Sequence, residues 1–378
     1  MTGIAVAAIS ARLLAEAAHD DGFDVSAMDL FGDADTRKAS ARWQAIGEAS
    51  HLQIDGPRLL SALEALAQGG RVAGWIAGAG FEGEPELLER GAQVLPLIGT
   101  GGGAMRRLRD PHAFFGFLDM HGIGHPAVQW AAPQDPDGWL FKDSHACGGW
   151  HIRRAGQADV EQAQGACYYQ REVQGRAMSA TFVANGRDAA VLGFNQLIAR
   201  PFGDRPFVFC GAIGPLPLPP MVAASVVAAV RAIAAGFDLR GLGSLDFMLE
   251  GDIVHVLEAN PRPPASMALY AARRGLVAAH VRACVEGLLP RWPPQSPGDP
   301  VHGTEVVYSP RQFSLDEGAA ERLAGYAGCH DLPAGAMAFE AGSPLCSVSA
   351  TGEDSQTVRE SLARRRDEVH RSLEEAYA

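Results

Sequence analysis

Apolar and polar positions follow two different periods over the first hundred residues. Short apolar runs that predict β-strands are separated by stretches with the 3.6-residue spacing of an amphipathic helix. The expected strands are Ile4–Ser10, Phe23–Asp29, Val72–Ala77 and Val94–Ile98, and the expected helices are Ala11–His19, Ala41–Ala49 and Pro57–Ala67. Strands that alternate with helices favour a parallel sheet covered by helices, so we predict an α/β unit here.

Beyond residue 100 the pattern changes from alternation to consecutive strands. A glycine-rich turn, Gly99–Gly103, precedes an expected helix at Pro111–Met120. The segments with strand character that follow are Trp139–Lys142, Cys167–Val173, Met178–Asn185 and Ala189–Phe194, and an apolar helix is expected at Met221–Ala235. Consecutive strands predict antiparallel pairing, and therefore an α+β arrangement for this part of the chain.

The densest group of polar residues lies on a predicted β-hairpin with the two-residue turn Gly251-Asp252. Asp246 and Glu258 lie at comparable distances from this turn, and Asn260 faces the same side as Glu258. Carboxylate and amide oxygens suit Mg²⁺, so the hairpin predicts a metal site that also holds phosphate groups. Arg262 lies just beyond, where a guanidinium stabilises charge on a transferring phosphoryl group. The alternative, solvated polar residues at strand ends, does not explain the restricted residue types.

Lysine is scarce in this chain, since only Lys38 and Lys142 occur among 32 basic residues. Arginine usually replaces lysine on a solvated surface, whereas a compact ammonium group suits a phosphate oxygen. Lys142 precedes the loop Asp143–Ile152, whose Gly148-Gly149 pair lets backbone N–H groups approach anionic oxygens. Lysine and loop together indicate a polyphosphate site, with an ordinary hairpin turn as the alternative. Cys147 in this loop is expected to be chemically inert.

Composition narrows the function classes further. A net charge of −12 over 378 residues argues against nucleic-acid binding by phosphate neutralisation. The apolar runs fall short of the ~20 residues that a membrane-spanning helix needs, and the N-terminus lacks the basic region of a signal peptide. Six scattered cysteines without a C-x-x-C pair suit a reducing compartment. We therefore expect a cytoplasmic protein that binds neither nucleic acid nor membrane.

Several motifs, taken in order, resemble a known family, the ATP-grasp superfamily, which includes biotin carboxylase and the carboxylate–amine ligases. The motifs are Lys142 before the glycine loop, Gln170-Arg171-Glu172-Val173, Asp246, and Glu258-Ala259-Asn260-Pro261-Arg262. The resemblance implies an ATP-grasp fold of mixed α/β and α+β class. It implies a Rossmann-like pre-ATP domain at 1–100, an ATP-grasp domain at 101–295 with a lid at about 128–169, and a small C-terminal α+β domain at 296–378. A final helix is expected at Ser355–Ala378.

The resemblance also implies roles for the residues that match the family's motifs. Lys142 would contact the phosphates of ATP, and Arg262 would stabilise the transition state that forms an acyl phosphate. The loop that covers the phosphates would consist of Ala146, Cys147, Gly148 and Gly149. The adenine would meet mainly the backbone of Gln170, Arg171, Glu172 and Val173. Two Mg²⁺ ions, or Mn²⁺ in their place, would be held by Asp246, Glu258 and Asn260.

The chain departs from the family pattern at four places. One is Asp246, because the first metal ligand of the family is often a glutamate, which is one methylene longer. Pro111 stands in a segment where many members carry an early lysine, so that contact is absent or is supplied by one of three arginines, Arg106, Arg107 or Arg109. Ala177 stands at a position where other members of the family often carry a glutamate that binds the ribose. The basic and acidic residues that follow the arginine in biotin carboxylase are replaced by Pro263-Pro264-Ala265-Ser266, which disfavours a bicarbonate-carboxylating role.

The function implied is an ATP- and Mg²⁺-dependent ligase that joins a small-molecule carboxylate to an amine through an acyl phosphate. A narrower likeness to predicted carboligase-type members implies a step in the biosynthesis of a one-carbon carrier cofactor of the methanopterin or methanofuran type. Two alternatives stay open: a catalytically weak nucleotide-binding scaffold, and an NAD(P)-dependent oxidoreductase. The oxidoreductase is disfavoured because Ser10-Ala11-Arg12 stands where a glycine fingerprint is needed. The oligomeric state is open, with a homodimer among the alternatives.

Overall fold

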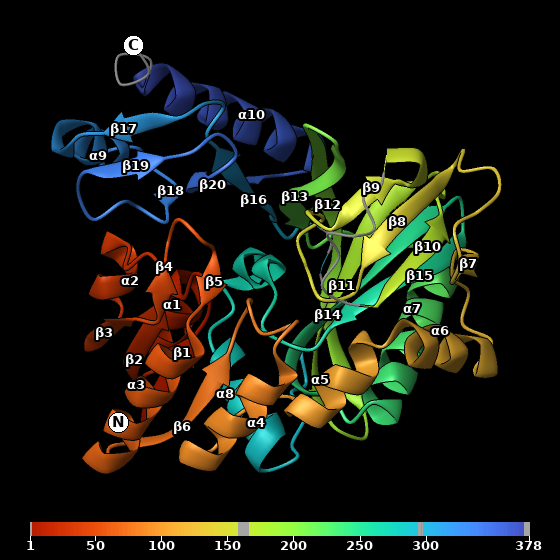
Figure 1. The fold of residues 1–378 in the computed structure, drawn as a ribbon, viewed down its shortest axis with the longest axis horizontal. Helices are drawn as coiled ribbons and strands as arrows, with labels where there is room; N and C mark the ends of the chain where they lie inside the picture. Colours follow the sequence, from red (N-terminus) through yellow and green to blue (C-terminus); the bar gives the residue numbers. More distant parts are fainter. Residues whose placement is uncertain (1, 158–165, 294–295, 297, 374–378) are drawn as a thin grey trace.

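The computed structural model describes residues 2–157, 166–293, 296 and 298–373. Its first unit is a four-stranded parallel sheet in the order β3-β2-β1-β6, which confirms the predicted parallel pairing. The strands are β1 (Gly3–Ala7), β2 (Asp24–Asp29), β3 (Arg42–Ala45) and β6 (Val72–Ala77), and the helices around them are α1 (Arg12–Asp20), α2 (Ala34–Lys38), α3 (Gly56–Gly69) and α4 (Pro85–Val94). Figure 1 shows this unit in red and orange.

Two sequence predictions in this unit are wrong. The segment Ala41–Ala49 is not a helix but contains β3 and β4 (Gly47–Glu48), which pairs with β5 (Gln53–Ile54). Pairing of β3 with β2, and a 2.7 Å hydrogen bond from Trp43 Nε1 to Asp29, outweigh a weak helical spacing. Likewise Val94–Ile98 is not a full strand, because Val94 ends α4 and only Leu97 forms a bridge, to Trp75.

A small antiparallel sheet follows after two short helices, α5 (Gly102–Arg109) and α6 (Pro111–Met120). Its strand order is β7-β10-β8-β9. The strands are β7 (Val128–Gln129), β8 (Trp139–Asp143), β9 (Ile152–Arg154) and β10 (Cys167–Arg171), with a 3₁₀ turn η1 at Ala155–Gln157. Lys142 therefore lies on a strand that is paired on both sides, to Ile152 and to Tyr168.

The largest sheet has eight strands in the order β15-β14-β11-β12-β13-β16-β20-β18. Its first five strands are β11 (Arg176–Asn185), β12 (Ala189–Phe202), β13 (Arg205–Gly214), β14 (Arg240–Glu250) and β15 (Ile253–Asn260). The predicted meander is confirmed, since β11, β12 and β13 pair in antiparallel succession. The predicted hairpin is confirmed as well: β14 and β15 pair so that Asp246 lies directly opposite Glu258.

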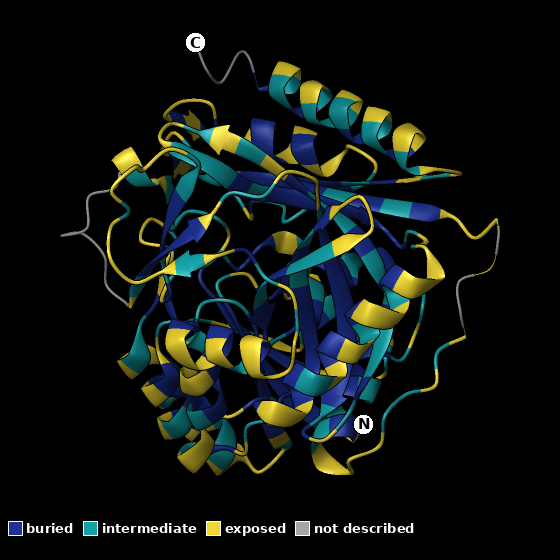
Figure 2. Ribbon diagram, turned by 90° about the vertical axis from the view of Figure 1, so that its right-hand side faces the viewer, coloured by how far each residue is buried: buried dark blue, intermediate teal, exposed yellow. Residues whose placement is uncertain are grey.

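Two hydrophobic cores join helices to this sheet. The apolar helix α7 (Pro220–Gly236) shares one core with α6 and with β11, β14 and β15. A second core joins the N-terminal unit to the sheet through α8 (Leu276–Val285) and the 3₁₀ segment η3 (Ala265–Tyr270). Figure 2 shows the strands buried between layers whose helices expose their outer faces. The N-terminal unit is thereby fixed against the sheet that carries the hairpin.

The C-terminal segment extends the same sheet. Strand β16 (Val301–Tyr308) pairs with β13 and with β20 (Pro344–Gly352), and β20 pairs with β18 (Cys329–His330). The strand pair β17 (Phe313–Leu315) and β19 (Met337–Phe339) and the helices α9 (Glu317–Ala324) and α10 (Ser355–Ser372) complete this part. The expected final helix begins at Ser355 as predicted, and residues 374–378 of it lie outside the described residues. The domain bounds expected from the sequence stay a prediction.

In the described residues, the helices are all too short or too polar to cross a lipid bilayer.

Candidate active site

One cavity of about 680 Å³ lies between the N-terminal unit, the small sheet and the large sheet. Of the predicted site residues, all but Ala146 line it: Lys142, Cys147, Gly148, Gly149, Gln170, Arg171, Glu172, Val173, Asp246, Glu258, Asn260 and Arg262. Residues from Lys142 to Arg262 in the sequence are therefore brought around one space. Ala146 lies in the same loop, and its carbonyl oxygen accepts a hydrogen bond from Arg109.

The hairpin presents a cage of oxygen atoms to this cavity. Asn260 Nδ2 donates to Asp246 Oδ2 and to Glu258 Oε1, at 3.2 Å each. Its carbonyl oxygen, Oδ1, is buried and has no hydrogen-bond partner among the described residues. A buried oxygen without a donor is costly unless a ligand satisfies it. Two carboxylates and this amide oxygen therefore fit a hard cation such as Mg²⁺.

The two carboxyl groups of the cage differ in their acidity. Burial, and repulsion from Glu258, raise the pKa of Asp246 to about 8. Burial also opposes ionisation of Glu258, but Arg109, His151 and Lys142 outweigh it and keep the Glu258 pKa below its usual range. Opposed shifts of this kind arise where two carboxylates share a confined space. A cation bound between them would remove the repulsion that keeps Asp246 protonated.

Lys142 is buried in the wall of the cavity and faces the same cage. Burial lowers the pKa of its ammonium group, while attraction to Glu258 and Asp246 raises it. Among the described residues, no hydrogen bond from this ammonium group is recorded. A buried ammonium beside two carboxylates is suited to contact a bridging phosphate oxygen.

Arg262 is held by a residue that sequence reasoning missed. Its Nε donates to Glu82 Oε1 at 2.6 Å, and the side chains of Glu82 and Arg262 are 2% and 13% exposed. Burial opposes ionisation of Glu82, but Arg262 and Arg109 lower its pKa to about 2. Glu82 lies before α4, among several glutamates of one segment, so the sequence offered no signal that distinguishes it.

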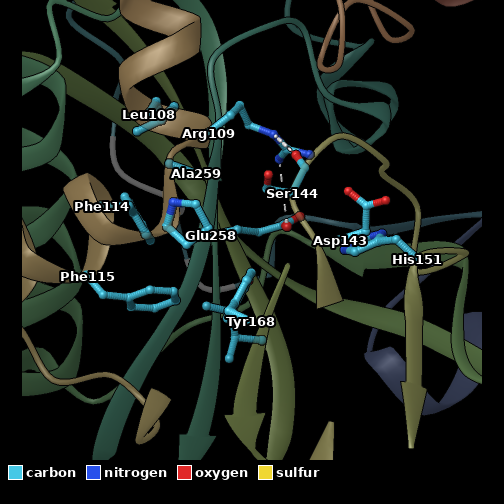
Figure 3. Close-up of a pocket in the computed structure, with 12 residues that line it drawn as sticks. Leu108, Arg109, Phe114, Phe115, Asp143, Ser144, His151, Tyr168, Glu258 and Ala259 are labelled. Atoms are coloured by element: carbon cyan, nitrogen blue, oxygen red, sulfur yellow. Dashed lines mark hydrogen bonds and ion pairs between the residues drawn. The ribbon is translucent and has the colours of Figure 1, made fainter. Parts of the chain in front are cut away.

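Arg109 is the arginine of the three candidates that reaches the site. Its Nε donates to the carbonyl oxygen of Ser144 at 2.9 Å and its Nη2 to that of Ala146 at 2.6 Å. Nη1 lies 4.0 Å from Glu258 Oε2. Figure 3 shows Arg109 directed at Ser144, with Glu258 beside it. Arg106 instead pairs with exposed glutamates, and Arg107 donates a hydrogen bond to the carbonyl oxygen of Gly103 in its own helix.

Two further side chains of the covering loop, His151 and Cys147, line the same cavity. Burial lowers the pKa of His151 to about 4, and its Nδ1 atom has no partner among the described residues. The Glu82 carboxylate and burial together raise the pKa of the Cys147 thiol to about 12. Because the thiolate is the reactive form of cysteine, this supports the expectation that Cys147 is inert.

The segment Gln170–Val173 also lines the cavity. The Arg171 guanidinium and the Glu172 carboxylate point to protein partners, Asp137 and Arg154. Gln170 is 1% exposed, and its Nε2 atom has no partner among the described residues. Buried donors without partners are rare, so the Gln170 amide is another group of the cavity wall that a ligand could satisfy.

Asp29, at the end of β2, is buried. Its carboxylate accepts hydrogen bonds from the backbone of Ala11 and Gly32 and from the Trp43 indole. Three donors from the protein occupy the oxygens that a ribose would need. The carboxylate has a structural role in joining β1, β2 and β3.

Residues 110–266 match the family model described as "ATP-grasp domain". The matched range contains the covering loop, the cage and Arg262. This range is therefore similar to an ATP-grasp domain. A sequence relative points the same way: the carbamoyl phosphate synthase large chain of Kocuria rhizophila is 30% identical in an alignment of 151 residues that covers 35% of this chain. The matched region is 13% of that relative, so the chain spans only a small part of its length.

Solved structures show the same fold over nearly the whole chain. The biotin carboxylase domain dimer of Hydrogenobacter thermophilus 2-oxoglutarate carboxylase, in complex with MgADP, ADP and bicarbonate, superimposes with a TM-score of 0.71 at 13% identity, covering 93% of this chain and 86% of that one. An L-amino acid ligase from Bacillus licheniformis gives 0.66 at 12% identity, covering 97% of each chain. N5-carboxyaminoimidazole synthase from Aspergillus clavatus, in complex with ADP and 5-aminoimidazole ribonucleotide, gives 0.68 at 15% identity, covering 97% and 98%. The expected ATP-grasp fold is confirmed.

Proposed function

We propose that this chain is an ATP- and Mg²⁺-dependent ligase that activates a substrate carboxylate as an acyl phosphate and joins it to an amine. The observation that carries the proposal is the convergence of Lys142, the Asp246–Glu258–Asn260 cage and Arg262 on one cavity. An ammonium, a guanidinium and an oxygen cage are the groups that phosphoryl transfer needs, because its catalysis consists mainly of positioning and charge neutralisation.

In the first step, a carboxylate oxygen of the substrate attacks the γ-phosphorus of ATP. The bond between that phosphorus and the β,γ-bridging oxygen breaks, and ADP leaves. In this proposal the ammonium of Lys142 would contact phosphate oxygens, and Arg262, whose Nε donates to Glu82, would supply positive charge to the transferring group. Mg²⁺ bound to the cage would neutralise the charge that develops on the phosphate oxygens.

In the second step, the nitrogen of an amine attacks the acyl carbon. The bond from that carbon to the phosphate oxygen breaks, phosphate leaves, and the ammonium product loses a proton. The acyl phosphate also reacts with water, so the loop that carries Cys147 and Gly148 has to cover the cavity while the intermediate exists.

A metal-ligand variant tests the proposal. Glu258→Gln should lower the rate of ADP formation by about 100-fold or more, because it removes a charged oxygen ligand where charge develops. The measurement is ADP release with ATP, Mg²⁺ and a panel of carboxylates and amines, with thermal unfolding as a check of the fold. Glu250→Gln, at the exposed end of the same hairpin, is the matched control. A Glu258→Gln protein with full activity would contradict the assignment.

Two finer parts of the proposal come from the sequence resemblance. One is a ligase step in the biosynthesis of a methanopterin- or methanofuran-type one-carbon carrier, which candidate precursors in the same panel would test. The other is assembly as a homodimer. A cytoplasmic location is favoured separately, by the six free cysteines. Binding of MgATP without ADP formation across the panel would instead support the nucleotide-binding scaffold.

A further inference from the structure

Arg109 differs from the other arginines of its helix in where it points. It is the last residue of α5, and its side chain is 9% exposed, whereas that of Arg106 on the same helix is 49% exposed. The next residue, Asp110, caps α6 by accepting a hydrogen bond from the backbone of His112. The Arg109 backbone is thus fixed between two helices, which restricts where its guanidinium can reach.

The guanidinium holds the covering loop by two main-chain carbonyl groups. Ser144 and Ala146 are two positions apart, and one planar fork binds both oxygens, at 2.9 and 2.6 Å. The far end of the loop is held separately, because the backbone N–H of Phe209 donates to the carbonyl oxygen of Gly148 at 2.9 Å. Residues between these two anchors include Cys147. A lysine in place of Arg109 would keep the charge but could not present two donors in this fork.

The same guanidinium also reaches toward the cage, since its third nitrogen lies 4.0 Å from Glu258. It therefore lies between the covering loop and a carboxylate of the cage (Figure 3). Hydrogen bonds from a charged donor are about twice as strong as neutral ones. The two bonds from Arg109 to the carbonyl groups of Ser144 and Ala146 therefore strongly determine the position of the loop.

We propose that Arg109 is a positioning residue that keeps the loop Ser144–Gly148 closed over the cavity through these two carbonyl groups. The consequence of this closure, which is protection of the acyl phosphate from water, rests on the proposed function. In the competing hydrolysis, a water oxygen attacks the acyl carbon, the carbon–oxygen bond to phosphate breaks, and carboxylate, phosphate and a proton are released. A loop that is held less tightly would increase the fraction of acyl phosphate lost to this hydrolysis.

The loop's own cysteine reports on its opening without any need for a substrate. Cys147 and Cys284 are both half-buried, and Cys284 on α8 lies far from the loop in sequence, so it serves as an internal reference. We would measure the rate of N-ethylmaleimide labelling at each cysteine by peptide mass spectrometry. The proteins compared are wild type, Arg109→Lys, and the matched control Arg106→Lys, which changes an exposed arginine of the same helix.

Arg109→Lys should speed labelling of Cys147 by about tenfold or more, because hydrogen bonds from a charged group are lost. Labelling of Cys284, and of both cysteines in Arg106→Lys, should stay at the wild-type rate. Arg109→Met, whose side chain has no N–H donor, replaces Arg109→Lys if that variant does not fold. An unchanged Cys147 rate, or equal acceleration at Cys147 and Cys284, would overturn the proposal.

Binding of MgADP separates this inference from the proposed function. If Arg109 acts on the loop, Arg109→Lys should change the MgADP dissociation constant by less than about threefold, because the positive charge remains. A tenfold loss of MgADP affinity with unchanged Cys147 labelling would make Arg109 a phosphate ligand and refute the positioning role. Wild-type protein that binds no MgADP would refute the proposed function, while the labelling comparison would still decide the role of Arg109.

Discussion

At the scale of single residues, the cavity is shaped by ion pairs between distant parts of the sequence. Glu82 and Arg262 are 180 positions apart, yet they form a buried pair at 2.6 Å. Gly80 adds a backbone N–H to the second carboxylate oxygen at 2.7 Å. Removing one partner of such a pair leaves the other charge buried without compensation, which costs more than the pair itself contributes.

Glu82→Gln should therefore lower the free energy of unfolding by about 3 kcal/mol. The measurement is urea unfolding at neutral pH. Glu84→Gln, two positions along the chain at an exposed site, should change it by less than about 0.5 kcal/mol. Equal stability of Glu82→Gln and wild type would show that Arg262 finds another partner or water.

The sequence predicted those site residues whose positions follow from local pattern. The Gly251-Asp252 turn sets the register that brings Asp246 opposite Glu258, and the scarcity of lysine singled out Lys142. Glu82 and Arg109 were not identifiable in the same way. Their contacts arise only when the N-terminal unit packs against the sheet, and residues next to them in sequence have the same chemistry.

At the scale of elements, a buried histidine joins three segments. His280 on α8 accepts a hydrogen bond at Nδ1 from the backbone of Leu242 on β14, and its Nε2 lies 2.8 Å from the carbonyl oxygen of Ile98. An imidazole that accepts at one nitrogen and donates at the other is neutral. Burial lowers the pKa of His280 to about 4, which matches this arrangement.

Wild-type stability should consequently depend on pH through His280. The unfolded chain takes up a proton near pH 6.5 and the folded chain only near 4, so stability is full above about 6.5 and falls as the pH drops toward 4. Between pH 7 and 5.5, wild type should lose about 1 kcal/mol more unfolding free energy than His280→Gln. Urea titrations at both pH values test this, with exposed His112→Gln as a control that should follow wild type. Parallel losses in wild type and His280→Gln would be the contrary result.

Elements were predicted well where their burial pattern is strong and poorly where pairing decides. The residues of β1 are all buried, as its apolar run requires. The segment Ala41–Ala49 has apolar positions at helical spacing, but its residues Arg42–Ala45 pair with β2 as strand β3. The hydrogen bonds that make β3 a strand come from β2, which is a separate segment of the chain, so the local spacing of apolar residues could not reveal them.

At the scale of the whole molecule, the final helix is fastened to the sheet by a buried carboxylate. Glu305 on β16 has a side chain 2% exposed and pairs with Arg200 at 2.6 Å and with Arg366 on α10 at 2.9 Å. Within the arginine run at 364–366, Arg364 is 61% exposed, whereas Arg366 is 25% exposed and takes part in this contact.

Arg366→Ala should lower the free energy of unfolding by about 2 kcal/mol, because a charge-assisted hydrogen bond to a buried carboxylate is lost while Arg200 remains. Arg364→Ala, two positions earlier on the same helix, should be nearly neutral. Chemical denaturation of both variants gives the comparison. Similar values for the two would mean that α10 is held by its apolar face alone.

The pairing of β13 with β16 limits how this chain can be divided. A fragment that stops near residue 295 would expose the outer edge of β13, where the backbone groups from Gly211 to Gly214 now meet β16. Bare strand edges recruit strands from other molecules. The smallest piece expected to stay monodisperse therefore extends through β20, even though the matched ATP-grasp region ends at residue 266.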